Sequence, residues 1–261
     1  MNMEITIAMP VYQRDLLAVN AIKSLCDITL VPKGIDVTFV VAVNELKQTT
    51  VDLIKEYSES VTQLNLIIHQ FDKNQGKAVA VNFVADTWPG DFIVTVDGDM
   101  VCIDPEWLKK MVRTYFAYNK NPMKNPRKNM KPMYLGSLCA NQLGLCGHNV
   151  KENDGYGFGY DVNGDTIITS IANGGIAGGV LMSDYQTWSD IGGYSGHRLV
   201  AADDGDYHLA CWEREKIVAY MKDVYFYHPH ELPSEYREWK NSFREVKNQY
   251  IPHSTTLKEI D

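Results

Sequence analysis

The first half of the chain alternates short apolar runs with segments in which apolar positions recur every three or four residues. Short runs rich in β-branched residues are typical of strands covered on both faces, and the longer spacing is typical of helices that pack on a sheet. The pattern predicts strands over 5–9, 37–43, 64–69 and 91–96, and helices over 15–26, 49–60, 78–85 and 105–118. Pro10 is expected to end the first strand. This alternation predicts an α/β fold with a mainly parallel central sheet flanked by helices.

The second half is less regular. Residues 119–132 combine lysine and arginine with three prolines, which predicts an exposed basic loop or a contact for an anionic substrate. Residues 144–165 hold six glycines and several aromatic residues, which predicts a mobile loop over a site. A helix is expected from Asp203 onward, and a late strand is expected over 224–227.

Composition narrows the class of protein. The 261 residues are 45% hydrophobic and 22% charged, and the net charge of −8 argues against general affinity for nucleic acid or anionic membranes. No apolar run approaches the roughly 20 residues that cross a bilayer, and no basic segment or cleavage site precedes the first strand. Five scattered cysteines are typical of reduced thiols. We therefore expect a soluble, cytoplasmic protein.

Two carboxylates separated by one glycine, Asp97-Gly98-Asp99, stand where the expected strand 91–96 ends. An Asp-Gly step alone is more often a hairpin turn. However, ligands of open α/β sheets bind beyond the carboxyl ends of the strands. Carboxylate oxygens also suit Mg²⁺ or Mn²⁺, which proteins hold with one or two carboxylates plus substrate phosphates. The step is therefore a candidate metal site.

A second acidic group, Asp203-Asp204-Gly205-Asp206, begins the late helix. Helix capping is the simpler explanation of acidic residues at this place. Three carboxylates in four residues exceed what capping requires, and their repulsion is expected to raise the pKa of at least one of them. A carboxylate with a raised pKa suits proton abstraction.

Three further features of the second half are candidates for the site. The glycine-rich segment 174–180 implies a close approach of the backbone to a ligand or to another segment. Trp188, Tyr194 and the aromatic residues of 156–160 are candidates to stack on a ligand, although core packing explains Trp188 equally well. His228 and His230, just past the late strand, are candidate metal ligands.

The order of these segments, over roughly residues 4–230, resembles inverting glycosyltransferases of the GT-A fold, close to family 2. The opening Ile7-Ala8-Met9-Pro10-Val11-Tyr12 is similar to the family's first strand and the turn against the nucleotide. Asn74-Gln75-Gly76-Lys77-Ala78, with Asn82, is similar to the segment before the metal motif, and Asp97-Gly98-Asp99 matches the DxD motif itself.

The second half resembles β-1,4-galactosyltransferases and polypeptide N-acetylgalactosaminyltransferases, in which an acidic pair supplies the base and a later histidine completes the metal site. The residues that carry this likeness are Gly178-Gly179-Val180, Gly192-Gly193-Tyr194 and Asp203-Asp204. Two positions depart from the family pattern. Asn44-Glu45 stands where an Asp-Asp pair often grips the base and ribose, and Asp203-Asp204 stands where Glu-Asp is usual.

The resemblance implies a single GT-A domain over 1–261. Its parts are a nucleotide-sugar-binding half (1–105), variable loops (119–165) and an acceptor-binding and catalytic half (170–261). It implies metal-dependent, inverting transfer from a nucleoside-diphosphate sugar, with a UDP-sugar as the expected donor and Mn²⁺ or Mg²⁺ as the cofactor. No membrane partner is expected.

Residue by residue, the resemblance implies the following roles. The expected base is Asp204, with Asp203 beside it. The expected metal ligands are Asp97, Asp99 and one of His228 and His230. The expected donor-binding residues are Pro10, Tyr12, Arg14, Asn44, Glu45, Gly76, Lys77, Asp97, Gly98 and Asp99. The expected acceptor-binding residues are Gly178, Gly179, Trp188, Tyr194 and Asp206.

Two other classes of function stay open at this point. A nucleotidyltransferase shares the alternating half and the need for metal, but it normally has a loop rich in glycine and basic residues after the first strand. A non-catalytic module that binds sugar nucleotides is the second alternative. The sequence leaves the acceptor open, with a glycan and a hydroxylated base in DNA as candidates. The basic residues Lys124, Arg127 and Lys128 leave room for an anionic acceptor, and the net charge opposes it.

Overall fold

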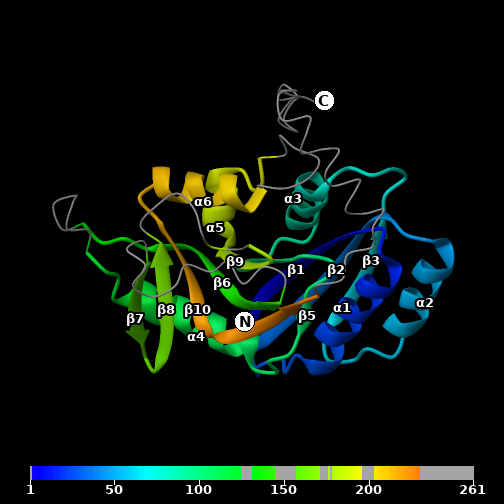
Figure 1. Ribbon diagram of the computed structural model, residues 1–261, viewed down its shortest axis with the longest axis horizontal. Helices are drawn as coiled ribbons and strands as arrows, with labels where there is room; N and C mark the ends of the chain where they lie inside the picture. Colours follow the sequence, from blue (N-terminus) through cyan, green and yellow to red (C-terminus); the bar gives the residue numbers. More distant parts are fainter. Residues whose placement is uncertain are drawn as a thin grey trace.

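The computed structural model describes residues 2–124, 131–144, 157–170, 176, 178–195 and 203–229. Within this part of the chain, a single ten-stranded sheet runs through both halves of the sequence, and helices cover both of its faces (Figure 1). The predicted α/β class is therefore confirmed. No helix in the described part is long and apolar enough to span a membrane.

The first half shows the predicted alternation. Four parallel strands lie in the order β3-β2-β1-β4: β1 (Met3–Tyr12), β2 (Ile35–Glu45), β3 (Asn65–Gln70) and β4 (Phe92–Val96). Their helices are α1 (Asp15–Ile28), α2 (Gln48–Ser58) and α3 (Lys77–Thr87). All five residues of β4 are buried, as expected for a strand covered on both faces.

Pro10 does not end β1, contrary to the expectation. The strand continues to Tyr12, and Pro10 lies opposite Ala42 of β2. The pairing of β1 with β4 ends at Ala8 opposite Thr95, so beyond this point one side of β1 has no strand partner. Proline has no N–H to donate, and it is tolerated where the ladder needs none.

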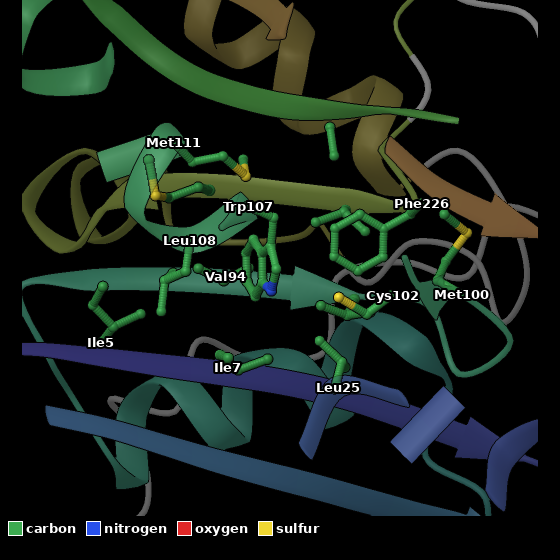
Figure 2. Close-up of a cluster of buried hydrophobic side chains, with 14 of the residues drawn as sticks. Ile5, Ile7, Leu25, Val94, Met100, Cys102, Trp107, Leu108, Met111 and Phe226 are labelled. Atoms are coloured by element: carbon green, nitrogen blue, oxygen red, sulfur yellow. The ribbon is translucent and has the colours of Figure 1, made fainter. Parts of the chain in front are cut away.

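The helices divide between the two faces of the sheet (Figure 1). One face carries α1, α2 and α4 (Trp107–Lys120), and the other carries α3, α5 (Tyr185–Ile191) and α6 (Asp203–Glu213). Trp107, the first residue of α4, packs edge-on against the Phe226 ring of β10, with the ring centroids 5.3 Å apart (Figure 2). The Trp107 indole N–H donates to Thr29 Oγ1 over 2.9 Å, so the buried ring leaves no polar atom unsatisfied.

Strand directions are mixed in the second half. β9 (Val180–Asp184) lies antiparallel between β4 and β6 (Leu135–Gly144), and β10 (Ile217–His228) runs parallel to β6. β5 (Val101–Cys102) and β8 (Asp165–Ser170) pair antiparallel with β10. β7 (Gly157–Val162) pairs antiparallel with β8. The parallel character predicted for the sheet thus belongs mainly to its first half.

Part of the segment predicted to be a mobile loop is a β-hairpin. β7 and β8 pair continuously from Gly157 opposite Ser170 to Val162 opposite Asp165. The turn between them is Asn163-Gly164, with φ of +54° and +86°. Asn-Gly is the strongest short-range hairpin signal, because both residues tolerate positive φ. The loop prediction was therefore wrong for this part, while 145–156 lies outside the described residues.

The predicted basic loop is only partly described. α4 extends into it as far as Lys120, and Lys124 forms an isolated bridge with Pro132. Arg127 and Lys128 fall within 125–130, outside the described residues. The contact proposed for an anionic substrate stays a prediction.

The strand directions bring distant residues to one edge of the sheet. Since β9 is antiparallel to both β4 and β6, the strands β4, β6 and β10 point the same way. The carboxyl ends of β1, β4 and β10 consequently meet at one edge, where ligands of α/β sheets bind. Arg14 follows β1, Asp97 to Asp99 follow β4, and His228 ends β10.

Candidate active site

Asp99 lies at the centre of the candidate site. Its Oδ2 accepts hydrogen bonds from Arg14 Nη1 at 2.7 Å and from His228 Nε2 at 2.9 Å. The register of β10 explains the histidine, because Tyr227 lies opposite Val101 of β5 and the next residue reaches the DxD step. Asp99 is only 5% exposed, so these partners replace water around its charge.

The electrostatics of this cluster favour charged forms. Burial alone would raise the pKa of Asp99, but the His228 hydrogen bond and the Arg14 charge hold it well below its usual value. Burial alone would lower the pKa of His228, but the hydrogen bond and charge of Asp99 raise it above its usual value. Arg14, predicted from the sequence to bind the donor, also contacts the DxD step in the structure.

The fit of a divalent cation can be tested on these residues. Adjacent ligands of an octahedral ion with bonds of about 2.1 Å lie about 3 Å apart. The 2.9 Å between Asp99 Oδ2 and His228 Nε2 matches that separation. His228 Nδ1 is buried and has no partner among the described residues. The two side chains therefore fit a cation.

Protein ligands alone do not complete the coordination. The described residues contain no group of three or more His, Cys, Asp or Glu side chains that could hold a metal ion. Mg²⁺-type sites usually add water and substrate phosphates to one or two carboxylates, so a partial set is compatible with a metal bound together with its substrate. His230 lies outside the described residues, and its candidacy stays a prediction.

Asp97, the first carboxylate of the motif, pairs with the first residue of α3. Lys77 Nζ lies 2.6 Å from Asp97 Oδ1 and 5.5 Å from the centroid of the Tyr194 ring. Burial alone would lower the pKa of Lys77, but Asp97, Tyr194 and Asp204 raise it well above its usual value. Gly76, the N-cap of α3, has φ +82°, a conformation that favours glycine.

Close packing explains the glycine between the two aspartates. A Cβ on Gly98 would lie 2.7 Å from the carbonyl oxygen of Pro10 and 2.9 Å from Val11 Cγ1. The end of β1 therefore touches the DxD turn directly. This contact gives Pro10 a structural role beside its predicted place near the donor.

Asn44, Glu45 and Tyr12 occupy the neighbouring strand ends. Asn44 is 5% exposed, and its Oδ1 accepts the backbone N–H of Gln75 at 2.9 Å. Glu45 is exposed, and its carbonyl accepts the backbone N–H of Gln13. The Tyr12 hydroxyl accepts from Gln13 Nε2 at 2.9 Å. Asn44 thus holds the loop before α3, while the exposed Glu45 side chain stays a predicted donor contact.

Asp204, the predicted base, is held by backbone donors. Its Oδ2 accepts the Gly178 N–H at 2.9 Å, and its Oδ1 accepts the Gly205 N–H at 3.0 Å. Burial would raise the pKa of Asp204, but the charge of Lys77 and these hydrogen bonds lower it below its usual value. The carboxylate of this acidic group with a raised pKa is therefore not Asp204, because a cation and backbone donors outweigh the effect of burial there.

The glycine-rich segment approaches another part of the chain, one of the two alternatives that the sequence left open. A Cβ on Gly178 would lie 2.4 Å from Asp204 Cβ, and one on Gly179 would lie 2.6 Å from Gln142 Nε2. The Gly179 carbonyl also accepts the backbone N–H of Asp97 at 2.8 Å. These two glycines therefore position Asp204 and the DxD strand; a direct acceptor contact stays a prediction.

Trp188 and Tyr194 lie in the core. Their exposed fractions are 3% and 1%, and their rings pack on each other at 5.1 Å and on Tyr207 at 4.9 and 6.0 Å. Neither ring has a free face for a sugar, which corrects the stacking interpretation. Tyr194 instead orders the site, since its backbone exchanges hydrogen bonds of 2.8 and 3.0 Å with the Asn82 side chain.

The remaining predicted acceptor and catalytic residues are placed as follows. Asp206 accepts a hydrogen bond from Ser195 Oγ at 2.9 Å, which ties α6 to the loop after α5. Asp203 is the first residue of α6, and its side chain lies outside what the structure describes. Of the aromatic cluster in 156–160, no side chain is described.

His208 is a residue of the site region that the sequence analysis missed. It lies one helical turn after Asp204 on α6, and its Nε2 is 3.8 Å from Cys139 Sγ of β6. Burial lowers the pKa of His208 to about 4, against the opposing charge of Asp204. The i, i+4 spacing on the predicted helix was the available signal.

The four described cysteines, Cys139 among them, are buried free thiols, as expected.

Comparisons with known proteins agree with this architecture. Residues 6–122 match the model of glycosyl transferase family 2. No curated protein sequence matches the chain significantly.

Among solved structures, the fold is similar to TarS residues 1–349 from S. aureus in complex with UDP, with a TM-score of 0.61 and 15% identity over 96% of this chain and 67% of that one. It is also similar to the mannosyltransferase PcManGT from Pyrobaculum calidifontis in complex with GDP-Man and Mn²⁺, with a TM-score of 0.61 and 16% identity over 92% and 60%. A third similar structure is GalNAc-T7 with UDP, GalNAc and Mn²⁺, with a TM-score of 0.63 and 10% identity over 98% and 53%.

The sheet order, the carboxylates at its edge and these likenesses define an α/β protein of the GT-A fold. The match to the model of glycosyl transferase family 2 lies in the first half of the chain and covers less than half of its residues. The chain spans from 53% to 67% of the three structures described above, so the activity of those whole proteins does not transfer to it directly.

Proposed function

We propose that this chain is a metal-dependent, inverting glycosyltransferase that moves a sugar from a nucleoside-diphosphate sugar to an acceptor hydroxyl. One observation carries the proposal. Lys77 pairs with Asp97 of the DxD step at 2.6 Å, and the charge of Asp204 acts on the same ammonium group. The predicted donor carboxylates and the predicted base, which are more than 100 residues apart in sequence, therefore belong to one electrostatic unit.

The donor side supplies charge for a diphosphate. Arg14 and Lys77 are cations at the carboxyl ends of β1 and β4, where a nucleotide lies in an α/β sheet. Guanidinium and ammonium groups bind phosphate oxygens with charge-assisted hydrogen bonds. Asp99 and His228, with Asp97 nearby, would hold Mn²⁺ or Mg²⁺, which when bound stabilises the charge of the leaving diphosphate.

Asp204 is the proposed general base. Its lowered pKa keeps it ionised at neutral pH, and the two backbone N–H donors fix the direction of its carboxylate. An ionised carboxylate near the acceptor hydroxyl takes the proton as the new bond forms. Attack from the face opposite the leaving diphosphate gives a single displacement, which inverts the anomeric configuration.

The donor and acceptor are proposed by class. TarS and GalNAc-T7 were solved with UDP, and PcManGT with GDP-Man, so the donor we propose first is a UDP-sugar and the second is a GDP-sugar. Asn44-Glu45 at the end of β2 replaces the usual acidic pair and makes the base specificity a point to measure. For the acceptor we propose a hydroxyl on a glycan or on a modified DNA base.

A donor screen tests the function. Purified protein is incubated with UDP-, GDP- and dTDP-sugars and candidate acceptors in Mn²⁺, Mg²⁺ or EDTA, and released nucleoside diphosphate is measured. We expect release with a diphosphate sugar and loss of release in EDTA. Asp99→Asn should lose both release and metal-dependent binding of the nucleoside diphosphate, and Asp165→Asn is the matched control at a buried aspartate paired with Arg113, away from the site.

The other two classes predict different products. Pyrophosphate release from a nucleoside triphosphate would identify a nucleotidyltransferase. Binding of sugar nucleotides without turnover, with every acceptor tested, would identify a binding module. For a donor and an acceptor that react, NMR of the product gives the anomeric configuration. Retention of the donor's configuration would overturn the single displacement.

A further inference from the structure

A single carboxylate oxygen at the site has two partners, a guanidinium and an imidazole. Asp99 Oδ2 lies 2.7 Å from Arg14 Nη1 and 2.9 Å from His228 Nε2. The exposed fractions of the three side chains are 6%, 13% and 12%, so water screens their charges little. A cation that binds Asp99 through this oxygen must therefore share the oxygen with the guanidinium, or replace the guanidinium.

The backbone holds Arg14 in that place. Gln13 and Arg14 have φ of +50° and +52°, and two successive non-glycine residues in the left-handed region are uncommon. The Gln13 N–H donates to the Glu45 carbonyl at 2.6 Å, which anchors this turn to the end of β2. α1 begins at the next residue. The turn thus directs the Arg14 side chain back to Asp99 across the edge of the sheet.

Strained backbone conformations that persist at a site often have a role there. A guanidinium beside a metal carboxylate lowers the affinity of the carboxylate for a second positive charge, because the two cations repel each other in a poorly solvated place. The same guanidinium has the planar, two-pronged geometry that suits phosphate oxygens. A donor diphosphate is thus an alternative partner for Arg14.

We propose that Arg14 is an internal competitor of the divalent cation at Asp99. Without donor, Arg14 neutralises Asp99 and keeps the affinity for the free metal ion low. When the metal arrives with a nucleoside diphosphate, Arg14 leaves Asp99 for the phosphate oxygens, and the metal takes its place. The proposal rests on the proposed function, and it makes Arg14 the residue that couples metal binding to donor binding.

Thermodynamic coupling gives the proposal its test. If donor and metal assist each other through Arg14, each must tighten the binding of the other by the same factor, and removal of Arg14 must shrink that factor. The change should appear mainly as tighter binding of the metal alone. An ordinary donor-binding arginine gives a different result, because its loss leaves the affinity for the free metal ion unchanged.

The experiment is a titration of the full chain with Mn²⁺, with free ion read from its EPR signal, in the absence and presence of UDP. Arg14→Gln and Arg14→Ala should bind Mn²⁺ about tenfold or more tightly than the natural chain without UDP. Arg113→Gln, which removes an arginine paired with Asp165 at 2.6 Å, should leave the affinity unchanged. The effect of UDP on Mn²⁺ binding should be smaller in both Arg14 variants.

Unchanged or weaker binding of Mn²⁺ alone, in Arg14 variants that keep the melting temperature of the natural chain, overturns the proposal. Arg14→Lys guards against a folding defect, because it keeps the charge and should stay close to the natural affinity. Tightening in Arg14→Lys as large as in Arg14→Gln would also overturn it. The titration needs no turnover, so absence of sugar transfer in the donor screen would defeat the proposed function without deciding this result.

Discussion

The carboxylates of the proposed donor side and of the proposed acceptor side of the site are held by different kinds of partner. On the donor side, Asp97 and Asp99 each pair with a side-chain cation, at 2.6 and 2.7 Å. On the acceptor side, Asp204 accepts two backbone N–H groups. A side-chain pair exchanges partners by rotation of a few bonds, whereas a backbone donor moves only with its segment.

This difference matches the chemistry proposed for each side. Donor carboxylates must release one cation and receive another when the metal and diphosphate arrive. The base must point at one atom during the displacement, and a shift of about 1 Å at a reacting group can cost on the order of 100-fold in rate. Exchangeable partners suit the first task, and a fixed backbone cradle suits the second. The following predictions test this contrast, starting with the largest effect.

Asp204→Asn should nearly abolish transfer. The amide keeps the size of the side chain but cannot take a proton, and loss of a general base typically costs about 10²–10⁴-fold in rate. Binding of nucleoside diphosphate and metal should survive. Kinetics at saturating donor and calorimetry with UDP and Mn²⁺ measure the two properties separately. Asp206→Asn is the control, since among the described residues its carboxylate accepts from Ser195 Oγ, and a larger loss there would move the base to Asp206.

Gly178→Ala should impair transfer by displacing the base. The added Cβ would lie 2.4 Å from Asp204 Cβ, so one of the two segments must shift. We expect a loss of about 10- to 100-fold in kcat and destabilisation of about 1–3 kcal/mol. Gly205→Ala is the matched control, because its Cβ would meet nothing within 4 Å. Equal turnover in the two variants would show that the cradle does not determine the position of the base.

Lys77→Met should affect both the proposed base, Asp204, and donor binding at Asp97. The charge of Lys77 lowers the pKa of Asp204, so its removal should raise that pKa and move the acid limb of the kcat profile to higher pH. Loss of the Asp97 partner should also weaken donor binding, by about tenfold for one charge-assisted contact. A pH–rate profile and a KM measurement distinguish the two effects. If the acid limb of the kcat profile stays at the same pH, the charge of Lys77 does not set the pKa of Asp204.

His208→Asn should flatten the acid sensitivity of folding. The folded pKa of about 4 lies below the usual value of 6.5, so between these pH values the unfolded chain binds a proton that the folded chain excludes. The natural chain should lose stability as pH falls from about 6.5 to about 4, by on the order of 2 kcal/mol from this residue. Urea unfolding at several pH values measures how the free energy of unfolding depends on pH in the natural chain and in His208→Asn. The same pH dependence in both proteins would refute the lowered pKa of His208.

Local patterns predicted the first half well because its contacts are regular. The strands β1, β2 and β4 are largely buried, the edge strand β3 is partly buried, and each helix packs on the sheet, so apolar spacing located the seven elements from β1 to β4. The exception is Pro10, which is expected to end the strand; the pairing of β1 with β4 ends at Ala8, and β1 continues past Pro10 beside β2 alone. Pairing, which decides such a case, is not visible in a single strand.

The sequence by itself determined the α/β class and the chemical groups available: the DxD carboxylates, the acidic start of α6 and a histidine after a strand. Only the tertiary structure decided their partners. The antiparallel insertion of β9 between β4 and β6 turns β10 so that His228 meets Asp99, and the turn after β1 delivers Arg14 to the same oxygen. The tertiary structure also places Trp188 in the core and lowers the pKa of Asp204. Such results depend on contacts between residues far apart in the chain, because burial and charge at a point are sums over everything packed around it.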